Sequence, residues 1–333
     1  MRITVGVAGL TLLSILLALA GDPAVSSQMR LGVKSEGVLA AKASKASATK
    51  TAKITKNTNS TKTNKKPRVT TKTSSWRILS IASKGLTEVS GCAISRRDPN
   101  RVWLHNDADD GPYVIAVDIT SGIAAKAVRL KGIDVVDPED IAITRAGELI
   151  LADIGDNALA RESVQLYRFP EPPANATSAL VSRLDLKYPN GAHNAEALIV
   201  SPDGSAAFIV TKEPSGLAQV FHADLTATGP QVLTLIGQVK IAGEVGKRAN
   251  LISAADATSA MFVVRTYQFG YLFKIPSGGT VADAFRVTPR RFDVPSMVQG
   301  EALCIDATGK TMVTASESRG AANFALAIGP TPE

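Results

Sequence analysis

Several short apolar runs of this 333-residue chain begin with a pair of positions, separated by a single residue, that usually hold polar side chains. Because residues i and i+2 of a β-strand project from the same face, the members of each pair would point the same way. The later position holds Ser90, Glu139, Glu196, Arg248 and Glu301, at spacings of 49, 57, 52 and 53 residues. The earlier position holds Glu88, Asp137, Asn194, Gly246 and Gln299. A third layer, at the ends of the next apolar runs, comprises Asn106, Asp107, Asp153, Lys212, Arg265 and Glu317.

Two acidic turns have the residue types of a hard-cation site. Asp153, Asp156 and Asn157 fall within the five residues D-I-G-D-N, and residues 107–111 have the rhythm D-x-D-x-G. Carboxylate and amide oxygens are the ligands that Ca²⁺ prefers. Placed with Glu139 and Glu196 at the same end of the funnel, the two turns predict a calcium site with Asp153, Asp156, Asn157 and Glu139 as its ligands, and no organic cofactor is expected. The alternative is that these residues only form tight turns, which use the same residue types.

Acid–base chemistry is expected at the same group of residues. The sequence contains no G-x-S-x-G, H-E-x-x-H, C-x-x-C or P-loop motif, which argues against acyl-serine, zincin, dithiol and nucleotide chemistry. The candidates for moving protons are Glu139, Glu196 and His105. Lys212 and Arg265 would steer a small anionic or polyhydroxy ligand. Alternatively, the charges neutralise one another and only line a water-filled channel.

A repeated unit would position these residues. In Asn194–Lys212, an apolar run, the turn S-P-D-G and a β-branched run predict a buried hairpin. Weaker copies occupy Glu88–Asp107, Asp137–Asp153, Gly246–Arg265 and Gln299–Glu317. Each interval has room for four strands, and a repeat of about 50 residues without helical periodicity is typical of a β-propeller. The sequence therefore predicts an all-β fold.

The ring is expected to close through the start of the folded part. The fifth unit ends after three strands, and the apolar run Trp76–Ala82 would supply the fourth. Such closure removes the exposed sheet edges. We therefore expect five four-stranded blades, with a sixth, degenerate blade as the alternative.

The two cysteines lie on the first strands of the first and fifth units, which are neighbours once the ring closes. Cys92 follows its anchor Ser90 by two residues and Cys304 follows Glu301 by three, so they face opposite ways on adjacent blades. In an oxidising compartment a Cys92–Cys304 disulfide would clip a long loop. Two buried free thiols are the alternative.

The first 75 residues differ in composition from the rest. Residues 1–20 have an early arginine, an apolar stretch and an A-L-A ending, which predicts a signal peptide cleaved near Ala20; an uncleaved anchor is the alternative. Residues 21–75 are rich in Lys, Thr, Ser and Ala and predict a disordered tether. Residues 1–75 carry a net charge of +11, which leaves −4 for the expected propeller domain, 76–333.

Export to the periplasm or the extracellular space follows from the predicted signal peptide. The basic tether would lie against acidic cell-surface polymers or lipid headgroups, or act as a solvated spacer. Nucleic acid is a poor partner for an exported chain with an acidic folded part. The protein is expected to act as a monomer.

Several motifs occur in order between residues 87 and 317: E-V-S-G, H-N-D, D-P-E-D-I-A, D-I-G-D-N, Y-R-F-P-E-P, N-A-E-A-L, T-K, R-T-Y and Q-G-E-A. Together they resemble a largely uncharacterised family of exported bacterial β-propellers, described as repeat-containing or phytase-esterase-like. The fourth unit departs from the family pattern with R-A-N-L-I-S, where an acidic or Thr-Gly opening is usual. More distantly, the mixture of Glu, Asn and Asp is similar to the calcium funnels of gluconolactonase-like propellers.

The resemblance implies a secreted propeller with a central funnel like an active site. Its lining residues would be Glu88, His105, Asn106, Asp107, Glu139, Asp140, Asp153, Asp156, Asn157, Glu196, Lys212, Arg265, Tyr267 and Glu301. Within this set and the third layer, ligand contacts are expected from Glu88, Asn106, Asp107, Lys212, Arg265, Tyr267, Glu301 and Glu317. The first hypothesis is a funnel that binds a cation and a small polar or anionic ligand. The alternatives are a metal-dependent hydrolase of lactones or phosphoesters, and a non-catalytic cell-surface interaction module.

Overall fold

The computed structural model describes residues 75–107, 111–241, 247–318 and 323–332. The expected signal peptide, 1–20, and the expected tether, 21–75, lie outside these ranges, Ser75 excepted. Among the described residues, no helix is long and apolar enough to cross a membrane.

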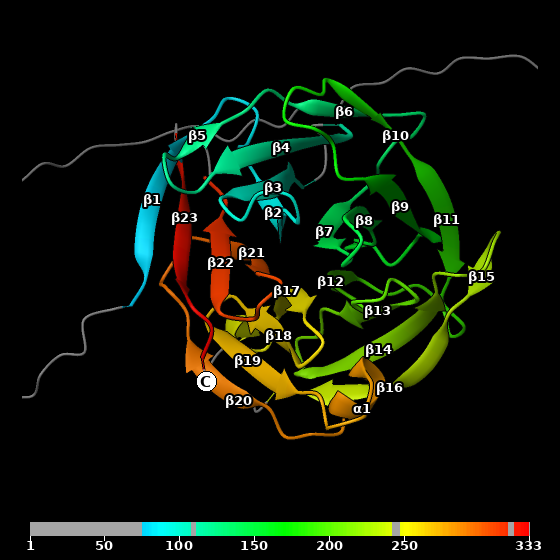
Figure 1. Cartoon of the computed structure of the whole chain (residues 1–333). Coiled ribbons are helices and arrows are strands. Elements are labelled where there is room, and N and C mark those ends of the chain that lie inside the picture. The colour runs from blue at the N-terminus through cyan, green and yellow to red at the C-terminus, as the bar shows by residue number, and fades with distance from the viewer. Residues whose placement is uncertain (1–74, 108–110, 242–246, 319–322, 333) are drawn as a thin grey trace, which may run out of the picture. The chain divides into compact units, whose positions relative to one another are not determined.

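Five antiparallel sheets are arranged in a ring, each beginning at the axis and ending at the periphery (Figure 1). Blade 1 consists of β2 (Val89–Ile94), β3 (Arg101–Asn106), β4 (Tyr113–Asp118) and β6 (Val128–Lys131), with β5 (Ile123–Ala124) beside β4. Blade 2 consists of β7 (Pro138–Ile143), β8 (Glu148–Asp153), β9 (Val164–Pro170) and β11 (Ser182–Lys187). Blade 3 consists of β12 (Ala195–Val200), β13 (Ala206–Thr211), β14 (Leu217–Asp224) and β16 (Thr234–Lys240).

The last two blades complete the ring. Blade 4 consists of β17 (Ile252–Ala257), β18 (Met261–Thr266), β19 (Phe269–Lys274) and β20 (Arg290–Asp293). The short helices η1 (Lys247–Ala249) and α1 (Val281–Ala284) precede and interrupt it. Blade 5 consists of β21 (Gly300–Ile305), β22 (Thr311–Ser316), β23 (Asn323–Pro330) and β1 (Arg77–Ala82). Two short strands, β10 (Ser178–Leu180) and β15 (Gln231–Val232), add in parallel to the outer edges of blades 1 and 2.

The N-terminal strand closes the ring. β1 pairs antiparallel with β23 from Arg77 opposite Ile328 to Ala82 opposite Asn323, and Figure 1 shows the two strands side by side at the outer edge of blade 5. The prediction of a five-bladed propeller closed by its first strand is confirmed. The six-blade alternative is wrong, because the described strands are accounted for by five sheets.

Apolar side chains fill the space between neighbouring blades. Ile150, Leu198 and Phe221 belong to the layer between blades 2 and 3, and every pair of neighbouring blades has such a layer. All six residues of each innermost strand are buried, since both faces of these strands are covered. Strands covered on both faces need uninterrupted apolar runs, which is why the repeats read as short apolar blocks and not as alternating patterns.

A β-bulge marks the second residue of every innermost strand. In all five blades the pairing with the next strand skips this residue, as the shift between Pro138 and Asp140 illustrates. A bulge adds one residue to one strand and re-aims its side chain. The five bulge residues are Ser90, Glu139, Glu196, Ser253 and Glu301.

The fourth bulge residue corrects the expected alignment. Arg248 was expected at this position but lies on η1, before the strand, and Ser253 takes its place on β17. The strand begins with Ile252, so no acidic residue marks its start. The other four anchors were placed correctly from the sequence.

Candidate functional site

Blades 1, 3 and 5 each bring a second polar residue to the end of the ring where the bulges lie. The residue that follows the second strand is held by its amide, which donates to the carbonyl oxygen two residues before the bulge. The distances are 2.8 Å from Asp107 N to Glu88 O, 2.9 Å from Lys212 N to Asn194 O and 3.0 Å from Glu317 N to Gln299 O. The backbone repeat therefore fixes where these side chains start.

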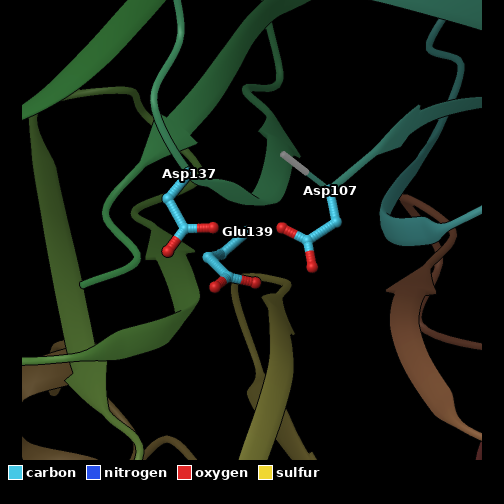
Figure 2. Close-up of side chains that lie close together, drawn as sticks. All are labelled: Asp107, Asp137 and Glu139. Carbon is cyan, nitrogen blue, oxygen red and sulfur yellow. The ribbon is translucent and has the colours of Figure 1, made fainter. Parts of the chain in front are cut away.

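Three carboxylates from blades 1 and 2 converge at this end. One oxygen each of Asp107, Asp137 and Glu139 lies within 4.8 Å of the others, and Figure 2 shows the carboxyl groups of this carboxylate trio turned toward one another. Asp107 follows β3, Asp137 precedes β7, and Glu139 is the bulge residue of β7. Glu139 is only 4% exposed, while the other two are half-buried.

Gly155 leaves the space that the trio occupies. A Cβ atom at this residue would lie 2.4 Å from Asp137 Oδ2 and 2.5 Å from Glu139 Oε1. Its amide also donates to the carbonyl oxygen of Asp137 at 3.0 Å. A glycine is therefore required here for close approach, which is the role of the glycine in the D-I-G-D-N turn.

Burial and mutual repulsion raise the pKa values of two members of the trio, Asp137 and Glu139. Burial, and next the neighbouring Asp107, raise the pKa of Asp137 to about 7. Burial raises the pKa of Glu139 well above its ordinary value, and Glu196, Asp107 and Asp137 raise it further. A raised pKa means that this environment favours the protonated form of both groups, and a bound cation would oppose that effect.

Beside the trio, a second group of side chains, which includes the positively charged Lys212, forms a chain of hydrogen bonds across blades 3, 4 and 5. Lys212 forms an ion pair with Glu196 and donates to the hydroxyl of Tyr267 at 3.0 Å. Tyr267 in turn donates to Glu301 Oε1 at 2.9 Å. Gln299 donates to the same oxygen at 2.8 Å and to Glu317 Oε1 at 2.9 Å. We call the trio and the residues of this chain the axial cluster.

The acid–base properties of the chain are set by burial and by the ion pair. Burial raises the pKa of Glu196 to about 8, although Lys212 opposes this. Burial alone would lower the pKa of Lys212, but Glu196 outweighs it and the pKa is raised. Arg248, although it lies outside β17, contacts this chain: its guanidinium lies over the Tyr267 ring, 4.4 Å from the centroid, in a cation–π contact.

The residues expected to bind calcium have other partners. Asp153 accepts hydrogen bonds from the amides of Val136 and Asp137 at 3.0 and 2.9 Å, and pairs with Arg161 at 2.8 Å. Its carboxylate thus braces the loop that carries Asp137.

The rest of that turn is also structural. Asp156 accepts from the amides of Ala160 and Arg161, each at 2.9 Å, and Asn157 accepts from Asn194 at 3.2 Å. Of the four expected metal ligands, the structure brings only Glu139 into the trio. The oxygens of Asp153, Asp156 and Asn157 instead accept hydrogen bonds from amides of neighbouring residues and from the side chains of Arg161 and Asn194.

Arg265 does not reach the axial cluster. It is fully buried between blades 4 and 5, where its guanidinium donates to Thr266 O at 3.2 Å and to Ala302 O at 3.4 Å and also contacts the Thr314 hydroxyl. Burial lowers its pKa to about 10. The expectation that Arg265 steers a ligand is corrected, because a guanidinium fixed between two sheets braces them instead.

His105 is also buried, at 2% exposure. Its Nδ1 lies 2.8 Å from the carbonyl oxygen of Asn106, and burial lowers the pKa of the ring to about 4. A Cβ atom on Gly91 would lie 2.3 Å from Nε2, so the ring is packed against β2. His105 is therefore neutral at pH 7 and is held inside blade 1, which argues against the expected role as general base in the cluster.

Of the remaining residues expected to line the funnel, Asn106 and Asp140 hold the backbone in place, and Glu88 lies exposed at the surface. Asn106 donates to Gly85 O at 3.0 Å and so holds the loop before β2, while Glu88 is exposed beside it. Asp140 accepts from the amides of Leu198 at 2.8 Å and Ala255 at 3.2 Å, which ties blades 2, 3 and 4 together. Asp140 is thus a buried structural carboxylate and not a lining residue.

Comparison with known proteins gives only distant similarities. No protein-family model and no curated protein matches the chain. Among solved structures, a gluconolactonase of Xanthomonas campestris is 13% identical, with a TM-score of 0.41 over 77% of this chain and 90% of the other. The U3-55K structure is 14% identical with a TM-score of 0.35, and the RRP9 WD40 repeats are 13% identical with a TM-score of 0.34; each match covers 73% of this chain and 67% of the other. These similarities assign no activity, and what the structure itself establishes is a five-bladed β-propeller with a polar axial cluster.

Proposed function

We propose that the carboxylate trio binds a hard divalent cation, with calcium as the first candidate. The observation that carries the proposal is that Asp107, Asp137 and Glu139 each place an oxygen within 4.8 Å of the others. Calcium takes six to eight oxygen ligands and favours carboxylates. A divalent ion would also remove the repulsion that raises the pKa values of Asp137 and Glu139. Gly155 supports the proposal because it keeps the space between these two carboxylates open.

A small anionic or polyhydroxy ligand would complete the site. Three carboxylates leave coordination positions of a calcium ion for ligand oxygens and water. In the hydrogen-bonded chain of the cluster, Lys212 offers an ammonium, and the exposed Arg248 lies over the Tyr267 ring. Arg248 thus takes the steering role first expected of Arg265. A bound calcium ion and the positively charged donors Lys212 and Arg248 would both favour a ligand that is rich in oxygen atoms.

Chelation followed by calcium addition tests this function. At a calcium concentration of about 100 times Kd, binding adds about 2.7 kcal/mol to the free energy of unfolding. For a domain of this size, Tm should then rise by about 5–10 °C. Asp137→Asn should weaken calcium affinity at least about tenfold, because it removes one of three charged ligands, and at the same calcium concentration the stabilisation should fall to about 1.4 kcal/mol or less.

Glu148→Gln is the matched control. Glu148 lies on the same blade, at the opposite end of β8, and pairs with Arg168. This variant should keep the calcium response of the wild type. A wild-type Tm that does not move at millimolar calcium would contradict the proposal.

The second candidate is a metal-dependent hydrolase of lactones or phosphoesters. The observation that favours it is the buried Glu196, whose pKa of about 8 allows proton exchange near neutral pH. A bound divalent cation would polarise the carbonyl or phosphoryl oxygen of the substrate. The Glu196 carboxylate would accept the proton of the attacking water, and Lys212 would hold that carboxylate in place.

Turnover of lactones and phosphomonoesters separates the two candidates. If the hydrolase function holds, Glu196→Gln should lower kcat at least about 100-fold while calcium binding stays within a few-fold of the wild type. The binding function alone predicts no turnover in either protein. Turnover that survives the substitution unchanged would place the chemistry elsewhere.

A further inference from the structure

The two cysteines of the chain meet near the axis, where the ring closes. Cys92 on β2 and Cys304 on β21 place their Sγ atoms 2.9 Å apart. They belong to different sheets, so no backbone ladder joins the two strands. Both cysteines are free thiols in the structure, with their sulfur atoms closer than van der Waals contact. The chain contains no other cysteine, so neither residue has an alternative partner within the molecule.

The surroundings of the pair are apolar and closed. Both side chains are 0% exposed and belong to the core layer between blades 5 and 1, with Val89, Leu104 and Val313 among their neighbours. Burial raises the pKa of both thiols. Thiols held neutral in such a layer are poor nucleophiles and poor metal ligands. This environment fits a structural pair and argues against a reactive or metal-binding one.

We propose that Cys92 and Cys304 form a disulfide that joins blades 1 and 5 beneath the axial cluster. The oxidant is a protein or small-molecule disulfide of an oxidising compartment, to which the expected signal peptide would deliver the chain. One cysteine thiolate attacks this disulfide and releases the first thiol; the other then displaces the second. The new S–S bond forms as the donor disulfide takes up two electrons and the two cysteine protons.

The bridge must form before folding is complete. In the folded protein neither sulfur is reachable from solvent, and an exchange reaction needs an accessible thiolate. Oxidation therefore accompanies closure of the ring, and the finished disulfide resists reductants as long as the protein stays folded. It acts as a permanent clasp and not as a switch.

The disulfide closes the ring near the axis, as β1 closes it at the outer edge. It fixes the position of β2 relative to β21; β2 carries a residue that contacts the axial cluster, and β21 carries one that belongs to it. Ser90, two residues before Cys92, donates to the carbonyl oxygen of Glu139 at 2.8 Å. Glu301, three residues before Cys304, accepts from Tyr267. The bridge thus ties the strand that supports the trio to the strand that ends the hydrogen-bonded chain. It also encloses a loop of more than 200 residues, the case in which a cross-link most restricts the unfolded chain.

Alkylation of the full-length protein tests the bond directly. Protein secreted from an oxidising compartment is denatured in guanidinium and treated with iodoacetamide, with and without prior reduction. The expected result by mass spectrometry is no alkylated cysteine without reductant and two after reduction. Two alkylated cysteines without reductant would overturn the proposal.

A variant cycle supplies an independent measurement. Cys92→Ala, Cys304→Ala and the double variant should each lower Tm by about 10 °C, because either single change already removes the bridge. Wild-type protein that is reduced in denaturant and refolded in the presence of reductant should show a similar loss. Small losses in the single variants that add up in the double variant would mean that the residues only pack as thiols.

Discussion

Removing residues 1–82 is expected to unfold the propeller, whereas removing residues 1–75 should leave its stability unchanged. The longer deletion takes away β1, which pairs with β23 along its whole length and buries Ile81 completely. The lost hydrogen bonds and apolar contacts amount to about 5 kcal/mol or more, a large part of the stability of a typical domain. The deletion also leaves β23 as an unpaired edge, which favours aggregation.

Thermal denaturation and size-exclusion chromatography of the two truncated proteins check this prediction. The shorter deletion starts the chain at Trp76 and keeps every residue of β1, so it controls for loss of the basic segment. A protein lacking residues 1–82 that melts within a few degrees of the wild type would mean that closure by β1 contributes little. Equal destabilisation by both deletions would assign the effect to the residues before the strand.

The calcium-free protein should lose stability as the pH rises from about 5 to about 9. Burial raises the pKa of Asp137 to about 7 and that of Glu317 to about 8, from ordinary values of 3.8 and 4.5. Glu139 and Glu196 are shifted in the same direction. In this window the folded protein therefore binds more protons than the unfolded chain, so the free energy of unfolding falls as the pH increases.

The size of the stability loss between about pH 5 and pH 9 depends on how deeply these four carboxyl groups are buried. After a discount for the half-exposed Asp137 and Glu317, the summed loss is on the order of 3 kcal/mol, or about 10 °C in Tm. Calcium should reverse the trend, because it competes with the same protons: its stabilisation is smallest at about pH 5 and largest above about pH 8.

Thermal melts in chelator and in calcium, recorded across this pH range, measure both trends. Glu196→Gln should flatten the calcium-free profile, since an amide does not titrate, and Glu148→Gln should leave it unchanged. A calcium-free Tm that rises steadily from about pH 5 to about pH 9 would mean that the axial carboxylates are already compensated.

The sequence was sufficient to predict the ring because its strands are short, buried on both faces and separated by turn residues. Runs such as residues 195–200 and 206–211 leave no helical alternative, and the missing strand of the fifth unit points to residues 76–82. The fourth blade was misaligned by five residues. There the polar anchor is Ser253, and Arg248, a more conspicuous residue, stands in the preceding turn.

The site was predicted less completely, because a bulge and a shift of one residue change where a side chain points. Lys212 and Tyr267 directly follow their second strands and reach the cluster, whereas Arg265 stands two residues before Tyr267, inside its strand, and is buried between blades. Acidic turns pose a second difficulty. Asp153 has the residue type of a calcium ligand, but local amides and Arg161 use its oxygens, and only coordinates show this.

The role of Gly155 was missed for a related reason. The glycine was read as part of a turn, although its function is to leave room for two carboxylates. The sequence placed Asp107, Asp137 and Glu139 at the same end of the ring, but it did not single out these three as the carboxylates that approach one another most closely.

Calorimetric titration of calcium into chelator-stripped wild-type and Gly155→Ala protein tests the central claim, that the repeat starts converge on a cation site. The added methyl group would lie within 2.5 Å of oxygens of both Asp137 and Glu139, while the backbone at this residue needs no left-handed conformation. We expect one calcium ion per wild-type chain and at least about tenfold weaker binding to the variant, whose fold is checked by circular dichroism. Equal affinity in both proteins, or no heat of binding to the wild type, would contradict the account.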